Sequence, residues 1–189
     1  MRDKDEAWVR HVLDSLTLMP VLAGLEAGDA VADVGAGGGA PGLVLAIARP
    51  DLRWTLIEST GKKARFLIEA AGALGLANVE IVARRAEDAG RDPALRGRCS
   101  AATARALGPL PTALELVMPM VRPGGLGLFI KGAKAGAEIE SSARAAGLLR
   151  CEILDCLRTP TGRIVVVEQS APTPRAYPRR PGDPKRAPL

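Results

Sequence analysis

The stretch Ala32-Asp-Val-Gly-Ala-Gly-Gly-Gly-Ala-Pro-Gly42 decides the fold, because it joins an apolar run of strand type to an apolar run of helix type through a glycine-rich turn. Gly35, Gly37 and Gly39 are free to adopt positive φ angles, and they let a ligand approach the backbone amides without interference from a Cβ atom. A strand, a turn of this kind and a helix, in that order, predict a site for a nucleotide-type cofactor.

Apolar runs of strand length alternate with helical patterns along most of the chain, which indicates parallel strands joined by helical crossovers. We therefore predict one doubly wound α/β domain over residues 1–170, with a mostly parallel, seven-stranded sheet. The strands are predicted at 30–34, 54–58, 79–83, 101–105, 125–131, 152–157 and 163–169. The helices are predicted at about 5–19, closed by Pro20, and at 43–48, 62–74, 109–118 and 134–146, with a turn at 122–125.

The excess of positive charge lies in the last residues of the chain. The formal net charge is +5, and residues 175–189 hold five basic side chains and one acidic one, so this ending alone carries +4. Six of the fifteen prolines lie at or after Pro172, and a proline cannot donate a hydrogen bond to a neighbouring strand. We therefore predict an extended, basic, proline-rich arm over 171–189, whose charge favours an anionic partner such as nucleic acid.

The composition excludes several other classes of protein. Hydrophobic residues make up 47% of the chain and charged residues 25%, which is typical of globular proteins and excludes wholesale disorder. The start of the chain has no secretory signal and no apolar run is long enough to span a bilayer, so we expect a cytoplasmic protein without a membrane partner. Three cysteines and one histidine, in no metal-ligand spacing, predict neither a disulfide framework nor a metal site. We also expect a monomer.

Two acidic residues bear on the identity of the cofactor. Asp33 stands two residues before Gly35, and the resulting Asp-x-Gly-x-Gly-x-Gly run resembles the first motif of S-adenosylmethionine methyltransferases, in which the acid faces the amino-acid end of the cofactor. The pattern Gly35-x-Gly37-x-x-Ala40 also satisfies a permissive dinucleotide fingerprint, which keeps NAD open. Glu58 follows Gly35 by 23 residues, a spacing at which an acid reaches the ribose hydroxyls of either cofactor.

Four further candidates come from the ends of later strands. Ala86 and Glu87 follow the third predicted strand, where an adenine contact is expected, although acidic residues there also suit the start of a short helix. Arg105 and Lys131 end the fourth and fifth strands, at the edge of the sheet where open α/β folds bind ligands. Each of these two cations can hold a phosphate or a guanine oxygen, or can be an ordinary charge at the end of a strand.

The residues that several kinds of methyl transfer need are absent from the sequence. Thr103-Ala-Arg-Ala106 stands where enzymes that methylate an exocyclic amine carry an Asn/Asp-Pro-Pro-aromatic cluster, and no cysteine follows a proline as in enzymes that activate a pyrimidine carbon. A nucleophile with a free lone pair, such as guanine N7, needs no deprotonation before it attacks. Positioning and electrostatics then suffice, and this chemistry fits the residues present.

Six segments together carry a resemblance to one family: VRHVLDS (9–15), DVGAGGGAPG (33–42), ESTGKKARF (58–66), ARA (104–106), FIKG (129–132) and YPRRPGDPKRAPL (177–189). They resemble the small-subunit ribosomal RNA guanine-N7 methyltransferases, also called glucose-inhibited division protein B, over nearly the whole chain. The resemblance implies a class I, Rossmann-like methyltransferase fold with S-adenosylmethionine as the cofactor. It also implies transfer of the methyl group to N7 of one guanine in bacterial 16S rRNA, as RNA or within the small ribosomal subunit.

The resemblance further assigns roles to individual residues. Contacts to the cofactor fall on Gly35 and Ala40 at the methionine side, Glu58, Ser59 and Thr60 at the ribose, Ala86 and Glu87 at the adenine, and Arg105, with Asp33, Gly37 and Gly39 completing the predicted set. The predicted catalytic residues are Arg105 and Lys131. The predicted RNA contacts are Lys62, Lys63, Arg65 and Lys131, with Arg179, Arg180, Lys185 and Arg186 in the basic arm.

The chain departs from the family pattern at two places. It begins almost at the His-x-x-Asp-Ser helix, whereas members of the family carry a further helical segment before it. Ala36 replaces a more usual Ser or Thr, which removes one potential hydrogen bond to the cofactor. Within the first helix, His11, Asp14 and Ser15 share one face at i, i+3 and i+4, where they can either close over the pocket together or form a local cap and hydrogen-bond cluster.

Three other functions stay open on the sequence alone. A small-molecule methyltransferase would share the cofactor but would tolerate deletion of residues 175–189, which an RNA enzyme would not. A non-catalytic ribosome-assembly factor would share the fold but would not bind S-adenosylmethionine. An NAD oxidoreductase is the most remote alternative, and binding measurements with both cofactors would exclude it.

Overall fold

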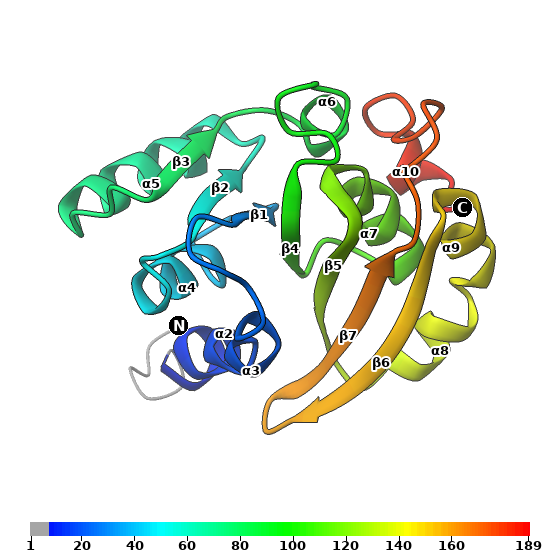
Figure 1. The fold of residues 1–189 in the computed structure, drawn as a ribbon, viewed down its shortest axis with the longest axis horizontal. Coiled ribbons are helices and arrows are strands. Elements are labelled where there is room, and N and C mark those ends of the chain that lie inside the picture. The colour runs from blue at the N-terminus through cyan, green and yellow to red at the C-terminus, as the bar shows by residue number, and fades with distance from the viewer. Residues whose placement is uncertain (1–7) are drawn as a thin grey trace.

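The computed structural model describes residues 8–189 and is built around one seven-stranded sheet (Figure 1). The strand order is β3-β2-β1-β4-β5-β7-β6; β1 to β5 pair in parallel and β7 is antiparallel to both of its neighbours. This sheet confirms the predicted doubly wound, mostly parallel architecture. The strands are β1 Ala30–Val34, β2 Arg53–Ile57, β3 Val79–Val82, β4 Cys99–Arg105, β5 Val121–Lys131, β6 Cys151–Thr159 and β7 Gly162–Gln169.

Helices cover both faces of the sheet, so the fold has three layers. Figure 1 shows α4 near the N-terminal helices, α5 along β3, and α7, α8 and α9 on the other side of the central strands. The helices are a π-helix Trp8–Leu13, α2 Asp14–Leu16, α3 Met19–Leu22, α4 Gly42–Ala48, α5 Gly61–Ala73, α6 Ala86–Ala89, α7 Leu110–Val117, a 3-10 turn Met118–Met120, α8 Ala135–Glu140, α9 Ala143–Leu149 and α10 Asp183–Arg186. Among residues 8–189, none of these helices combines the length and the apolar character needed to cross a bilayer.

Two apolar cores separate these layers, because successive side chains of a strand point to opposite faces. Val31 of β1 is fully buried in the same cluster as Leu45 of α4, on one face of the sheet. The next residue, Ala32, is fully buried in the other cluster with Leu114 of α7. Burial on both faces explains why β1 is a continuous apolar run, broken only by Asp33.

The first predicted helix, 5–19 closed by Pro20, is wrong in its boundaries. Residues 5–7 lie outside the described part of the chain, and from Trp8 the helix is a π-helix that passes into the short helix α2. Pro20 does not end the helical region, because it lies in the first turn of α3, where the missing amide hydrogen is not needed.

The helix predicted at 134–146 is interrupted and forms the two helices α8 and α9. Ser141 and Ser142 lie at the break, and both hydroxyls donate hydrogen bonds to the carbonyl oxygen of Glu138. Serine hydroxyls that bond back to the preceding turn compete with helical hydrogen bonds, which accounts for the interruption.

The turn predicted at 122–125 is a bulge inside the long strand β5. Cys99 pairs with Val121 while Ala101 pairs with Leu126, so four residues of β5 stand against the single residue Ser100 of β4. Gly124 takes a φ of +77° in this bulge, a conformation that suits glycine.

The C-terminal residues do not form the predicted extended arm, because they fold back onto the domain. Arg96 donates hydrogen bonds to the carbonyl oxygens of Thr173 (2.8 Å) and Tyr177 (2.8 Å). The carboxylate of Glu115, which is fully buried on α7, accepts hydrogen bonds from the backbone amide (2.8 Å), Nε (2.8 Å) and Nη2 (2.6 Å) of Arg179. The Arg96 guanidinium thus satisfies backbone carbonyl oxygens, and the Glu115 carboxylate a backbone amide, in a proline-rich segment that cannot pair as a strand of the sheet.

Arg179→Ala tests this attachment, with Arg180→Ala as the matched control. Removing the Arg179 guanidinium leaves the buried Glu115 carboxylate with its charge uncompensated, so we expect the free energy of unfolding to fall by about 3 kcal/mol. Arg180 is exposed, and its replacement should change stability by less than about 0.5 kcal/mol. Urea denaturation of the two variants measures the difference, and equal stabilities would contradict the attachment.

Candidate functional site at the carboxyl edge of the sheet

The glycine-rich turn lies at the carboxyl end of β1, where the strand order reverses between β1 and β4. Ligands of open α/β sheets bind at such a switch point. Gly35 and Gly39 have φ angles of +74° and +94°, which confirms the positive φ expected for these glycines. A Cβ atom at Gly35 would lie 2.7 Å from Leu107 Cδ1, and one at Gly39 would lie 2.5 Å from Leu43 Cδ1. The turn therefore needs glycine both for its backbone angles and for its close approach to neighbouring residues.

Asp33 holds the two ends of the turn together from inside the protein. It is 1% exposed, and its carboxylate accepts hydrogen bonds from the Gly42 amide (2.9 Å) and the Thr103 hydroxyl (2.9 Å). A Cβ atom at Gly42 would lie 2.6 Å from Asp33 Oδ2, so glycine is required there for the contact. Burial raises the pKa of Asp33 to about 6, against the opposing effects of the Thr103 and Gly42 hydrogen bonds and the charge of Arg105. The structure thus gives Asp33 a role in shaping the loop, and its contact with a cofactor stays a prediction.

Glu58 holds the middle of the turn from the end of β2. Its Oε2 accepts a hydrogen bond from the Gly37 amide (2.9 Å) and its Oε1 from the Thr60 amide (2.7 Å). Burial alone would raise the pKa of Glu58, but the hydrogen bonds from Thr60 and Gly37, with the charge of Lys63, bring that pKa below its ordinary value. An ionised carboxylate keeps further lone pairs on both oxygens, so Glu58 can also accept hydrogen bonds from the hydroxyls of a ribose.

Three hollows border the turn and collect most of the predicted site residues. A small one, about 90 Å³, is lined by Gly35, Glu58, Ser59, Ala86 and Glu87 together with Ile57, Arg84, Arg85, Leu107 and Leu116. A second, about 390 Å³, is lined by Gly38, Gly39, Ala40 and Arg105 together with His11, Leu43, Val44, Ile47, Phe66, Ala70 and Leu74. The third, about 620 Å³, is lined by Gly37, Gly38, Lys62, Lys63, Arg65, Phe66 and Glu69.

Ala86 and Glu87 begin the short helix α6, which confirms the helix-start alternative for these residues. Glu87 is 3% exposed, and its Oε1 accepts hydrogen bonds from the Gly182 amide (2.8 Å) and from Arg85 (3.1 Å). Glu87 therefore ties the small hollow to the C-terminal segment. Its contact with an adenine ring stays a prediction, supported by its place in the lining of that hollow.

Arg105 joins the end of β4 to the N-terminal helices. Its Nη2 lies 3.0 Å from His11 Nδ1, and its Nη1 lies 3.4 Å from Asp14 Oδ2. Asp14 also accepts a hydrogen bond from Thr161, in the hairpin between β6 and β7. The structure brings together His11, Asp14 and Arg105, whereas the Ser15 hydroxyl is turned back onto the His11 carbonyl oxygen.

Lys131, predicted as both a catalytic and an RNA-binding residue, is engaged with the protein itself. Its ammonium donates hydrogen bonds to the Gly108 carbonyl oxygen (2.7 Å) and to Glu138 Oε2 (2.8 Å), and its side chain is 9% exposed. The Leu110 amide donates to the same Glu138 oxygen (2.7 Å). Lys131 therefore has a matched charge and fixes the loop between β4 and α7.

The predicted RNA contacts divide into exposed and engaged residues. Arg179 is engaged with Glu115, and the Arg186 guanidinium pairs with Asp183 while remaining 80% exposed. The other predicted RNA contacts are exposed side chains: Lys62, Lys63 and Arg65 on α5, and Arg180 and Lys185 near the C-terminus.

Three site residues were not predicted from the sequence. Thr103 anchors Asp33, and its only signal is a polar residue in the middle of the buried strand β4. Leu107 packs over Gly35, and nothing in the sequence pattern distinguishes it. Phe66 is 51% exposed and borders both larger hollows, and an aromatic side chain among the basic residues of α5 was the signal for it.

Ala36, where the family pattern has Ser or Thr, and possible metal ligands remain to be placed. The methyl group of Ala36 is 2% exposed within the apolar core that contains Leu43, so its side chain is directed into the protein. Among residues 8–189, no group of three or more His, Cys, Asp and Glu side chains is arranged to hold a metal ion.

Comparison with known proteins identifies the family to which this chain is similar. The family model described as rRNA small subunit methyltransferase G (GidB) matches residues 1–160. The ribosomal RNA small subunit methyltransferase G of Sorangium cellulosum is 48% identical over 178 residues, which cover 94% of this chain and 74% of that protein. The protein of the same name from Moorella thermoacetica is 39% identical over 193 residues, covering 99% and 80%.

Solved structures show the same fold at low sequence identity. The antibiotic-resistance methyltransferase Kmr matches with a TM-score of 0.62 and 20% identity, over 82% of this chain and 93% of that one. Geranyl diphosphate C-methyltransferase from Streptomyces coelicolor A3(2), in complex with Mg²⁺, geranyl diphosphate and S-adenosyl-L-homocysteine, matches with a TM-score of 0.63 and 14% identity, over 83% and 78%. These structures confirm the class I, Rossmann-like methyltransferase fold.

The raised pKa of Asp33 makes stability depend on pH in a predictable direction. The pKa of an unfolded Asp is about 3.9, so the native state binds the proton of Asp33 more tightly than the unfolded state does. Protonation of Asp33 therefore stabilises the fold at low pH, and this stabilisation is lost as pH rises through about 6. Between about pH 4 and pH 7, wild type should therefore lose up to about 3 kcal/mol of stability relative to Asp33→Asn, which keeps the shape of the neutral acid.

Urea denaturation of both proteins across this pH range measures the difference. Asp51→Asn is the control, because the hydrogen bond with Arg49 lowers the pKa of Asp51. Wild type should therefore gain stability relative to Asp51→Asn as pH rises, and this change should appear at lower pH than the change for Asp33. A stability difference between wild type and Asp33→Asn that does not vary with pH would contradict the assignment.

Proposed function

Because the chain belongs to the rRNA small subunit methyltransferase G family, we propose that it transfers a methyl group from S-adenosylmethionine to N7 of a guanine in the 16S rRNA of the small ribosomal subunit. The observation that carries the proposal is the family match over most of the chain, and the glycine turn held by two carboxylates at the switch point of the sheet supports it. Because ribosomal subunits are its proposed substrate, the proposal includes a cytoplasmic location.

The residues around the turn fit S-adenosylmethionine. Glu58 is held ionised by amides on both oxygens and suits the ribose hydroxyls, with Ser59 and Thr60 exposed beside it. The small hollow that runs from Glu58 to Ala86 and Glu87 suits the adenine. Gly35, Gly39 and Ala40 line the hollows on either side of the turn, and we assign their backbone to the methionine end. S-adenosylmethionine, when bound, supplies an electrophilic methyl group on a sulfonium.

The protein has little covalent chemistry to do in this reaction. Guanine N7 carries its lone pair in the plane of the base, so attack needs orientation and no general base. Arg105 borders the 390 Å³ hollow, and its guanidinium is oriented by His11 and Asp14. We assign Arg105 to the target guanine, because arginine donates readily to guanine oxygen and nitrogen acceptors. Lys131 acts as a positioning residue, which holds the loop after β4.

Phe66 and the basic residues of α5 provide a surface for the RNA around the target. Phe66 stands between the hollow that contains Arg105 and the hollow that contains Lys62, Lys63 and Arg65. Proteins that read single-stranded RNA stack unpaired bases on exposed aromatic rings. We therefore assign Phe66 to a base of the rRNA and the cations beside it to phosphates, which set the position of the RNA without reading its sequence.

The proposed activity is tested with small subunits that lack the modification and with S-adenosylmethionine labelled in the methyl group. We expect the label in 16S rRNA, at one guanine, and strand cleavage at that base after borohydride and aniline, because N7 methylation leaves the ring positively charged and labile. Absence of label from 16S rRNA, with intact S-adenosylmethionine binding, would contradict the proposal.

Arg105→Ala in the same assay tests the assignment of the guanidinium. Loss of one preorganised donor lowers kcat by about 100-fold in comparable sites, and we expect that order of effect. Arg144→Ala, an exposed arginine on α9, is the control and should retain wild-type kcat. Melting temperatures of both variants separate a catalytic loss from unfolding of the N-terminal helices.

A further inference from the structure

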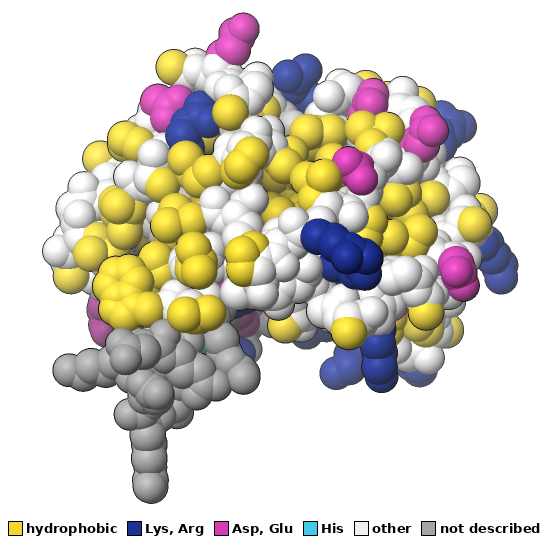
Figure 2. All heavy atoms as spheres, turned by 90° about the horizontal axis from the view of Figure 1, so that it is seen from below, with side chains coloured by type: hydrophobic (Ala, Val, Ile, Leu, Met, Phe, Trp, Pro, Cys, Tyr) yellow, Lys and Arg dark blue, Asp and Glu magenta, His cyan; other side chains and the backbone are white. Residues whose placement is uncertain are grey.

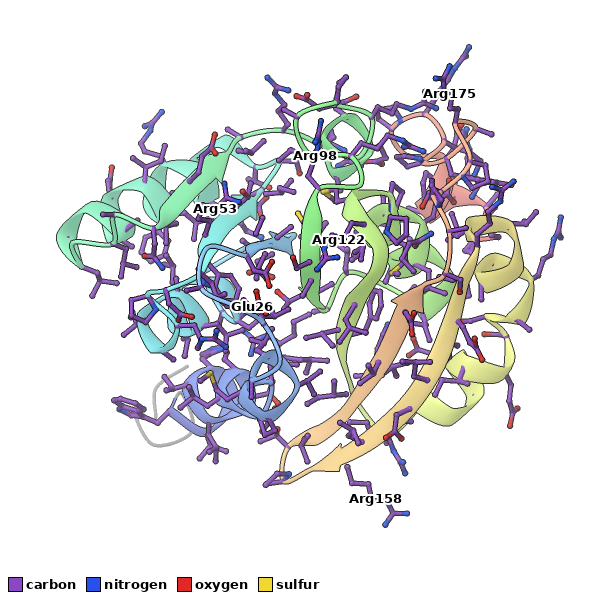
Figure 3. All side chains as sticks on the ribbon, viewed as in Figure 1. Glu26, Arg53, Arg98, Arg122, Arg158 and Arg175 are labelled. Atoms are coloured by element: carbon purple, nitrogen blue, oxygen red, sulfur yellow. The ribbon has the colours of Figure 1, made fainter. Side chains whose placement is uncertain are left out.

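Four arginines surround a hollow that no part of the proposed function uses. The hollow has a volume of about 570 Å³ and is lined by Arg91, Arg96, Arg98 and Arg175, together with Pro93 and Gly97. Five of these residues belong to the loop between α6 and β4, whereas Arg175 comes from the C-terminal segment. Figure 3 shows Arg98 and Arg175 on the same side of the molecule, at the top of the view. We call this feature the arginine groove.

Arg96 forms the rigid base of the arginine groove. Its Nη1 donates to the carbonyl oxygens of Gly90 (2.7 Å) and Tyr177 (2.8 Å), and its Nη2 donates to those of Thr173 (2.8 Å) and Pro174 (3.1 Å). These acceptors are neutral, so they fix the guanidinium without cancelling its charge. The groove is therefore built by the same contacts that attach the C-terminal segment to the domain.

The charges of the arginine groove are close enough to repel one another. Burial is the main reason that the pKa of Arg96 is lowered, and the charges of Arg91 and Arg175 lower it further. Within residues 8–189, no ion pair involves Arg91, Arg98 or Arg175, and no carboxylate lines the hollow. The nearby Asp92 pairs instead with Arg84 at 2.7 Å. An anion bound in the groove would relieve this repulsion.

The arginine groove lies far from the methyl-transfer site. Arg98 directly precedes β4, a strand of seven residues whose other end is Arg105. At about 3.3 Å per residue, the two ends of this strand are separated by about 20 Å. The groove and Arg105 therefore cannot contact the same nucleotide, but both can contact one folded RNA.

We propose that the arginine groove binds the sugar-phosphate backbone of the rRNA substrate, about 20 Å from the target guanine. The inference rests on the proposed function and adds a second, remote contact with the same substrate. Guanidinium groups favour phosphate oxygens because their planar donors form paired, charge-assisted hydrogen bonds. The lining contains no aromatic side chain on which a base would stack, so the contact is with the backbone and does not read sequence.

The opposite side of the molecule lacks such a concentration of charge. Figure 2, which views the molecule from below relative to Figure 1, shows a face largely covered by apolar and uncharged side chains, with Lys and Arg scattered and interspersed with Asp and Glu. The arginine groove is therefore a local concentration of positive charge, which suits a polyanion.

The double variant Arg91→Ala/Arg175→Ala tests the proposal, because both residues are exposed and their removal leaves Arg96 and its carbonyl contacts intact. Arg158→Ala is the matched control, an exposed arginine of β6 drawn at the bottom of Figure 3. Binding of 16S rRNA transcript is measured directly by filter binding across a salt series. Methylation of small subunits gives KM and kcat, and calorimetry gives the affinity for S-adenosylmethionine.

We expect the double variant to bind RNA about tenfold more weakly near physiological salt, with the slope of log affinity against log salt reduced by about 1 for each arginine removed. The KM for small subunits should rise similarly, while kcat, the melting temperature and S-adenosylmethionine affinity stay at wild-type values. Inorganic phosphate at millimolar concentration should compete only weakly, because a free ion makes one contact where the backbone makes several.

Wild-type RNA affinity and salt slope in the double variant, equal to those of Arg158→Ala, would overturn the proposal. Strong competition by inorganic phosphate with an unchanged RNA slope would also overturn it, by assigning the groove to a free anion. The methylation assay tests the proposed function separately, because wild-type protein would leave 16S rRNA unlabelled if that function were wrong. Filter binding would still decide whether the arginine groove contacts RNA.

Discussion

Two buried carboxylates, Asp33 and Glu58, determine the shape of the glycine-rich turn. A turn made largely of glycine has almost no side chains with which to fix its own conformation, and glycine loses more conformational freedom on ordering than any other residue. Asp33 supplies the constraint at the end of the turn, through Gly42 and Thr103, and Glu58 supplies it in the middle, through Gly37. The turn is therefore positioned by β1, β2 and β4 before any ligand binds.

The same site is connected to both ends of the described chain. Arg105 links it to His11 and Asp14, and Glu87 links it to the C-terminal segment through the Gly182 amide. The segment that carries most of the net charge is thus part of the folded domain. Its basic residues contribute in two ways, since Arg179 attaches the segment to α7 while Arg175 completes the arginine groove.

The strands were predictable because burial on both faces makes them continuous apolar runs, and β1 at 30–34 was predicted without error. The glycines, Glu58 and Ala86 were predictable for a related reason, because their places at strand ends follow from the topology. Two contacts were not predictable, that of Arg179 with Glu115, 64 residues away, and that of Lys131 with the Gly108 carbonyl oxygen, 23 residues away, because only the folded chain brings these residues together. The interruption between α8 and α9 likewise depends on which serine hydroxyls turn back to the helix.

A crystal structure of the protein with S-adenosylhomocysteine would show directly whether the clamped glycine turn is the cofactor site. We expect the ribose hydroxyls within hydrogen-bond distance of the Glu58 carboxylate and the adenine beside Ala86 and Glu87, with the turn unchanged. Another hollow, of about 620 Å³, lies at the opposite edge of the sheet and is lined in part by Arg53 and Trp54. Density for the ligand in that hollow, with none at the glycine turn, would show that the turn is not the cofactor site.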